Sequence, residues 1–257
     1  MLRGGVVVFV VLIGQTGSLF AQQKVASRQK PAPVSVPFVG CRSDGQAGPE
    51  EAPSGTSLDM PIRAEQAERL AYYNSGRLGV LAPRGWYCFG AYGSGGESVL
   101  VSPMAIDARM IFSGDWSGFA GSAVHLSHRI GDTSGRFDVA DIIARVFPAF
   151  RAFTAQVSRS APGYRPSFGP YPNDVLTYKG GTVVEYRTPA QTTGLGTRSW
   201  LKKNDSPITG VAILAEATPD LFLLAVRLPS DLGGLTPLIV QQLEREARDL
   251  PQPKSHR

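Results

Sequence analysis

The sequence predicts an α+β fold with a largely antiparallel sheet, a long central helix and a C-terminal helix. Short strand patterns follow one another directly, which is typical of hairpins and therefore of antiparallel pairing. One long stripe of apolar residues with helical spacing separates two groups of such strands, and a last helix begins at Thr236-Pro237. With 42% hydrophobic and 18% charged residues among 257, the chain is too apolar for a disordered protein and too polar for a polytopic membrane protein.

The N-terminus has the composition of a signal peptide. Arg3 precedes an apolar run from Val6 to Ile13, which is too short to span about 30 Å of hydrocarbon but suits the core of a secretion signal. We expect cleavage after Ala21, with an uncleaved membrane anchor as the alternative. Because no later segment is long and apolar enough to cross a bilayer, the sequence predicts no transmembrane segment in the mature chain and export to the periplasm or the extracellular space.

Cys41 and Cys88 are the only cysteines in the sequence, and outside the cytosol such a pair is expected to form a disulfide. Phe38-Val39-Gly40-Cys41 also resembles the cleavage site of a lipoprotein, which would place a lipid on Cys41. A polar, proline-rich segment separates that site from the apolar leader, whereas a lipoprotein site follows its leader directly. The disulfide is therefore the favoured interpretation.

The chain before the long stripe contains a linker, a first helix and several strands. The linker is rich in polar residues and proline and has no regular periodicity. Asp59 and Gly76 predict the ends of a first helix over Pro61–Asn74. Aromatic and alternating runs then predict a hairpin of Trp86–Tyr92 and Ser98–Ser102, followed by a strand at Ser122–Ile130. The expected segments are a signal peptide at 1–21, a flexible linker at 22–37, a single α+β domain at 38–250 and a tail at 251–257.

The apolar stripe runs from Val139 to Val157 and predicts a helix that faces the core. Pro148 interrupts it and removes a backbone donor, so we expect a kink near Arg145–Phe147. A proline- and glycine-rich loop over Ala161–Pro172 follows the stripe. The remaining patterns predict strands at Asp174–Tyr178, Thr182–Arg187, Ser199–Lys203, Ile208–Ala215 and Leu221–Leu228, and a last helix from Thr236 to about Arg248.

The three histidines do not predict a metal site. His125 and His128 lie in an alternating run, and their odd separation places them on opposite faces of a strand. The third histidine, His256, is in the tail, so a zinc site would lack ligands. We expect no metal and no cofactor, and we expect His128 to be a hydrogen-bonded residue of the core.

Motifs of nucleophilic catalysis are absent from the sequence. No serine lies in a G-x-S-x-G turn, and the two S-x-x-K matches, at Ser199–Lys202 and Ser27–Lys30, lack the other elements of a penicillin-interactive enzyme. The glycines of Gly90–Gly96 suit a hairpin turn rather than a phosphate-binding loop. A pair of carboxylates stays open as a catalytic site, and the acidic residues considered for it are Asp107, Asp115, Asp132 and Glu185.

A polar and aromatic group of residues is the candidate recognition surface, because tyrosine and tryptophan combine apolar area with a hydrogen-bonding tip. Ordinary packing of loops on the sheet is the alternative interpretation. The net charge of +5 at pH 7 does not indicate a class of partner, because basic and acidic residues are interspersed along the chain. We expect no groove that binds nucleic acid. The candidate ligand-binding residues are Arg84, Trp86, Tyr92, Tyr164, Phe168 and Tyr171.

Several segments resemble a group of uncharacterised exported bacterial proteins: Val39–Gln46, Ala82–Gly90, Tyr92–Ser94, Arg187–Ala190 and Gly194–Thr197. The resemblance implies an envelope or secreted setting and a structural cysteine pair, and it implies no activity. The C-terminal half also loosely resembles PsbP-like α/β/α sandwiches.

Two functions follow as expectations. The first is a non-enzymatic exported module that binds an envelope component, a peptide or a protein partner. The second is a hydrolase with a carboxylate-based site. Missing motifs and few histidines favour the binding module. A pocket with two convergent acids or a His–acid pair, lined by one of the four candidate acids, would favour the hydrolase.

Overall fold

The computed structural model describes Met1 and residues 33–251. The expected signal peptide, most of the expected linker and most of the expected tail lie outside the described residues. From residue 33 onward, the described chain belongs to one compact unit.

The larger of two sheets has eight strands and confirms the expected antiparallel character. Every neighbouring pair in it is antiparallel except β2 and β6, which run parallel. The hairpin of β6 and β7 and the strands β8, β11 and β12 agree with the sequence prediction to within two residues at each end. In order across the sheet, the strands are β2 (Ser43–Gly45), β6 (Tyr87–Gly93), β7 (Gly96–Ser102), β8 (Ala123–Arg129), β12 (Asp220–Arg227), β11 (Ile208–Ala215), β10 (Val183–Thr188) and β9 (Val175–Tyr178).

The smaller sheet has four strands, and the sequence prediction missed it. The expected linker is wrong for its last residues, because Val34 pairs with Met60 at the start of a strand. The expected helix over Pro61–Asn74 is also wrong, because it divides into the four-residue helix α1 (Ala64–Ala67) and a buried strand. The order of this sheet is β3 (Ser57–Met60), β1 (Val34–Gly40), β4 (Leu70–Asn74) and β5 (Gly79–Pro83).

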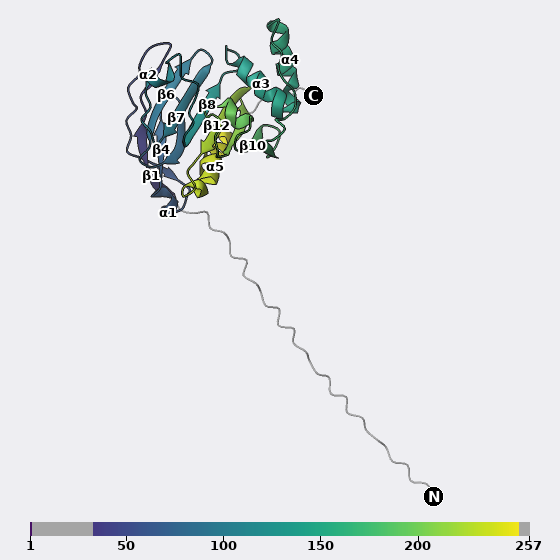
Figure 1. Cartoon of the computed structure of the whole chain (residues 1–257). Helices are drawn as coiled ribbons and strands as arrows, with labels where there is room; N and C mark the ends of the chain where they lie inside the picture. The colour runs from purple at the N-terminus through teal and green to yellow at the C-terminus, as the bar shows by residue number, and fades with distance from the viewer. Residues whose placement is uncertain (2–32, 252–257) are drawn as a thin grey trace. The chain divides into compact units, whose positions relative to one another are not determined.

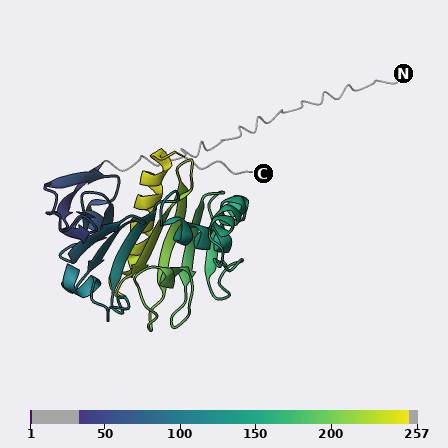
Figure 2. The same cartoon turned by 90° about the horizontal axis from the view of Figure 1, so that it is seen from above.

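Both faces of the large sheet are covered, and each face has its own core. Val99 and Val101 of β7 belong to one core and Leu100 to the other, as expected for side chains that alternate along a strand. The first core includes residues of the small sheet and of α5 (Thr236–Glu246), which is yellow in Figures 1 and 2. The second includes residues of α3 (Arg136–Val146), which is teal in the same figures.

The long apolar stripe forms two helices rather than one kinked helix. Phe147 ends α3 with φ −121° and ψ 70°, because Pro148 disfavours helical backbone in the residue before it. A 3-10 turn at Pro148–Phe150 then leads into α4 (Arg151–Ser160). The fully buried Thr154 of α4 donates a hydrogen bond to the Ala140 carbonyl of α3, at 3.2 Å, which holds the two helices together.

The remaining short elements agree in part with the sequence prediction. The expected strand at Ser199–Lys203 is wrong, because only Leu201 pairs there, in a single bridge to Phe119. The other short helices are α2 (Ala108–Ile111) and the 3-10 turns Leu195–Arg198, Gly233–Leu235 and Ala247–Asp249.

A disulfide joins Cys41 and Cys88, with their Cα atoms 5.3 Å apart, and confirms the expected pairing. Cys41 directly follows β1 of the small sheet and Cys88 lies in β6 of the large sheet, so the bridge links the two sheets. Within residues 33–251, no helix combines the length and the apolar character needed to cross a membrane.

Candidate ligand-binding groove

A groove of about 630 Å³ lies between α4, the loop after β8 and the turn between β11 and β12. We call it the α4 groove. Its apolar part comes from aromatic and aliphatic side chains of α4 and from the turn, and its polar part from arginine, glutamine and hydroxyl side chains. The residues used below are Gly131, Asp132, Arg136, Phe150, Ala152, Phe153, Val157, Arg159 and Pro219.

The apolar wall follows from helical spacing. Phe150 directly precedes α4, Phe153 and Val157 lie three and seven positions further on, and these positions share one helix face. Phe150 and Val157 are buried, whereas Phe153 is only partly buried. The same face therefore contributes to the second core and to the α4 groove.

Gly131 brings the walls of the groove together. A Cβ atom at this position would overlap the carbonyl oxygen of Pro219 and lie 3.5 Å from the ring of Phe153. The Gly131 N–H donates to Asp220 Oδ1 at 2.8 Å, which fixes the loop after β8 against the start of β12. A side chain here would force the loop away from the turn, so glycine is required by the close approach.

The charge in the α4 groove is positive. Arg136 donates to the Thr133 carbonyl at 3.0 Å and covers the Phe137 ring at 4.7 Å. Within the described part of the chain, neither Arg136 nor Arg159 forms an ion pair with a carboxylate. Asp132 is the one acidic residue among those that line the groove, and it is exposed to solvent.

His128 forms the one ion-paired histidine site found within residues 33–251. Its Nδ1 lies 3.3 Å from Glu97 Oε1 and its Nε2 lies 3.1 Å from Asp220 Oδ2. The ring stacks on Phe222, with centroids 4.3 Å apart. Burial disfavours the charged ring, but hydrogen bonds to Asp220 and Glu97 outweigh burial and raise the pKa of His128 to about 9. We call this set the His128 clamp.

The His128 clamp is not arranged as a general base. A catalytic histidine needs one ring nitrogen directed at the substrate, while the other is held by an orienting group. Both nitrogens of His128 face carboxylates, and the ring is a cation at neutral pH. A neighbouring cavity of about 370 Å³ contacts Glu97 and His128, but the clamp offers it no free nitrogen.

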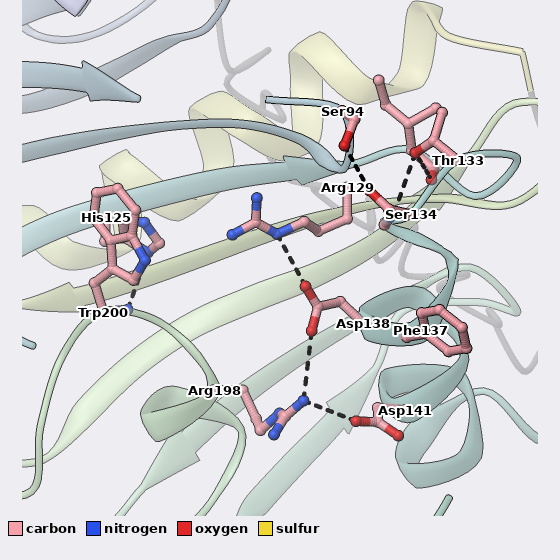
Figure 3. A network of polar contacts seen from close by, with 12 residues as sticks. Ser94, His125, Arg129, Thr133, Ser134, Phe137, Asp138, Asp141, Arg198 and Trp200 are labelled. Atoms are coloured by element: carbon pink, nitrogen blue, oxygen red, sulfur yellow. Dashed lines mark hydrogen bonds and ion pairs between the residues drawn. The ribbon is translucent and has the colours of Figure 1, made fainter. Parts of the chain in front are cut away.

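His125 lies on the opposite face of β8, as its spacing from His128 predicts. It is fully buried, stacks on Trp200 at 4.6 Å and accepts a hydrogen bond from the Trp200 N–H (Figure 3). Burial lowers the pKa of His125 to about 3, so the ring is neutral. Over the described residues, no three histidine, cysteine or acidic side chains are grouped as metal ligands.

One pair of carboxylates does converge, and it involves a candidate acid. Lys179 forms ion pairs with both Glu185 and Glu244, the second at 3.3 Å. Burial, together with a hydrogen bond to Glu185, raises the pKa of Glu244. Because the ammonium group lies between the two acids, it holds both carboxylates in a structural ion-pair cluster.

The other candidate acids have separate positions. Asp107 caps α2 by accepting a hydrogen bond from the Met110 N–H at 2.9 Å. Asp115 is exposed, and Asp132 lies alone among the acids of the α4 groove.

The structure does not bring the candidate recognition residues into one surface. Trp86 packs with the first core and Tyr171 with the second, on opposite faces of the large sheet. Arg84 donates to the carbonyls of Ala67 at 2.9 Å and Leu70 at 3.4 Å, so it holds α1 against β4.

The tyrosines of that candidate surface also have structural partners. Tyr92 donates to the Gly48 carbonyl and lies under Arg77. Tyr164 donates to Asp141, at 2.7 Å, within the Arg129–Asp138–Arg198–Asp141 network shown in Figure 3. Tyr171 lies under Arg145 at 4.2 Å, and Phe168 is exposed near Arg151. A shared role of these residues in ligand binding stays a prediction, and the structure does not place them in one site.

The sequence did not identify the α4 groove. Helical spacing places Phe153 and Val157 in the core stripe, and no sequence pattern distinguishes Arg136 and Arg159 among the 26 basic residues. The available signal was Pro148: it separates α4 from α3, and a separate short helix can turn part of its apolar face away from the core.

Comparisons of the chain with protein-family models, with curated proteins and with solved structures find no match. The resemblance to exported bacterial proteins and the PsbP-like alternative therefore stay predictions.

Proposed function

We propose that this protein is an exported, non-enzymatic binding module of the bacterial envelope, and that it holds a small ligand in the α4 groove. The volume of the groove, about 630 Å³, carries the proposal. It lies within the range of small-molecule sites, which combine apolar walls with a few polar groups. The disulfide supports the exported setting, because such bonds persist in oxidising compartments.

Binding is favoured over hydrolysis by the arrangement of the ionisable side chains. The α4 groove contains one acid and no histidine, so it lacks the pair of groups that proton transfer requires. The His128 clamp has no free ring nitrogen, and Lys179 pairs with both acids of the Glu185–Glu244 cluster. A hydrolase at either place would first have to break ion pairs.

The proposed function is tested by filling the groove from its exposed side. Ala152 is an exposed residue that lines the groove, and Ala155 is an exposed residue of the same helix that does not. We expect Ala152→Trp to weaken binding of the neutral fluorescent probe phenylnaphthylamine by about tenfold or more, because the indole would occupy the space of the probe. Ala155→Trp should leave the affinity unchanged.

Fluorescence titration of both variants and of the wild-type protein measures this difference. Circular dichroism and thermal melting check that each variant folds. If both tryptophan variants bind the probe as well as the wild type does, the α4 groove is not the binding site and the proposed function is wrong.

A further inference from the structure

We infer that the ligand of the α4 groove is an amphipathic anion: a small soluble molecule with an apolar body and one acidic group. This inference rests on the proposed function and names the chemical class that the groove would take. It follows from two arginines at a groove with an apolar wall, neither of them paired with a carboxylate in the described residues.

The pairing of neighbouring arginines shows that Arg136 and Arg159 are different. Arg129 pairs with Asp138, at 3.3 Å, and Arg198 pairs with Asp138 and Asp141. Carboxylates are therefore available near α3, and they are used by other arginines. Arg136 and Arg159 retain unpaired charge beside apolar side chains.

The position of Arg136 is not explained by the stability of its helix. Arg136 is the first residue of α3, where the helix dipole is positive and a basic side chain is unfavourable. Its charge and the positive end of this 11-residue helix act in the same direction and favour an anion at that end of the groove. Arg159 lies in the last turn of α4, where a basic residue is favourable, and it adds a second cation beside the groove.

The apolar residues that line the groove indicate the chemistry of the rest of the ligand. Phe150, Phe153 and Val157 offer an apolar wall that suits an acyl chain or an aromatic ring system. Asp132 is exposed, so solvent screens its repulsion of an anion. The volume, about 630 Å³, is that of a site for one small molecule, so the ligand is a free amphiphile and not a membrane surface.

The test uses two probes that differ by one acidic group. Anilinonaphthalene sulfonate carries the aromatic body of phenylnaphthylamine together with a sulfonate. We expect the wild-type protein to bind the sulfonate about tenfold more tightly, as one charge-assisted hydrogen bond would give. Raising the salt concentration should weaken only the binding of the anionic probe.

Substitution of the arginines shows which side chains produce the preference for the anionic probe. Arg159→Gln should remove most of the preference for the anionic probe and leave the affinity for the neutral probe unchanged. Arg159 is exposed, and its side chain forms no hydrogen bond within residues 33–251, so this variant is expected to fold. Arg136→Gln should act in the same way, and Arg151→Gln, an exposed position of α4 outside the groove lining, is the matched control.

The outcomes separate this inference from the proposed function. If the wild-type protein binds the two probes with equal affinity, and Ala152→Trp still abolishes binding of both, the inference of an anionic ligand is wrong and the proposed binding function remains. If Ala152→Trp changes the affinity for neither probe, the inference and the proposed function are both wrong. Binding to anionic lipid vesicles without binding of either free probe would replace the soluble amphiphile with a membrane surface and overturn the inference.

Discussion

His128 carries a positive charge because carboxylates from two neighbouring strands hold both of its nitrogens. Glu97 belongs to β7 and Asp220 to β12, on either side of β8. Asp220 also accepts the Gly131 N–H, so the His128 clamp connects three strands of the large sheet to a wall of the α4 groove. One side chain thereby contributes to stability in a way that depends on pH.

The raised pKa of His128 predicts a specific dependence of stability on pH. The pKa is 6.5 in the unfolded chain and about 9 in the folded one. The stabilisation is therefore complete below pH 6.5 and is lost as the pH rises through 9. We expect His128→Gln to destabilise the protein near neutral pH, and the difference from wild type to shrink by about 2 kcal/mol over that interval, a value reduced for solvent screening. Urea unfolding at several pH values measures it, and parallel pH profiles for the two proteins would contradict it.

In the large sheet, Tyr186 and Gly210 form a unit across three strands. They are paired across β10 and β11, and the Tyr186 hydroxyl donates to the Leu224 carbonyl of β12 at 2.8 Å. A Cβ atom at Gly210 would overlap that carbonyl oxygen and lie 2.7 Å from the Tyr186 hydroxyl. Because Gly210 has no side chain, the Tyr186 ring can cross over it to reach β12. The ring in turn covers the backbone that the glycine would leave exposed.

This unit predicts two unequal losses of stability. Gly210→Ala should cost about 3 kcal/mol or more, because the new methyl group meets backbone and a buried ring that cannot move aside. Tyr186→Phe should cost about 1 to 2 kcal/mol, since it removes one buried hydrogen bond and keeps the ring. Chemical denaturation of both variants gives the values. A Gly210→Ala variant as stable as the wild type would contradict the close packing.

The strands show which parts of the fold local sequence could predict. The strands β8, β11 and β12 have clear patterns and lie where the sequence placed them. By contrast, β4 has buried side chains at adjacent positions and pairs in parallel with β1, 34 residues earlier in the chain. The residues of β4 therefore show no alternation. Gly76, which the sequence predicts at the end of a helix, lies instead in the turn between β4 and β5 with φ +86°.

The candidate site was less predictable than the fold, because its two arginines differ from the others only in having no carboxylate partner among the described residues. Whether an arginine is paired depends on which acids the fold brings near it. Arg198 and Asp141 are 57 residues apart and form an ion pair, whereas Arg159 pairs with no acid in the described part of the chain. Sequence spacing carries no signal for either result. The separate positions of Trp86 and Tyr171 have the same origin, since loops distant in sequence pack on different faces.

For the molecule as a whole, a disulfide links the two sheets in addition to the backbone that runs from one to the other. Cys41 and Cys88 are separated by 47 positions and join the end of β1 to β6. The small sheet also packs against the rest of the protein through side chains of the first core, and the Tyr73 hydroxyl of β4 accepts a hydrogen bond from the Trp86 N–H. The disulfide is therefore expected to stabilise the small sheet more than the far side of the large one.

Replacing both cysteines tests this role at the scale of the whole molecule. The double variant Cys41→Ser/Cys88→Ser should lower the free energy of unfolding by about 4 kcal/mol, because the unfolded chain regains the freedom of the closed loop. Amide hydrogen exchange should accelerate first in β1, β3 and β4, while β12 near the middle of the large sheet stays protected. The wild-type protein treated with a reductant should behave in the same way. Equal acceleration in β1 and β12 would mean that the two sheets open as one cooperative unit, and that the bridge stabilises the whole molecule rather than the attachment of the small sheet.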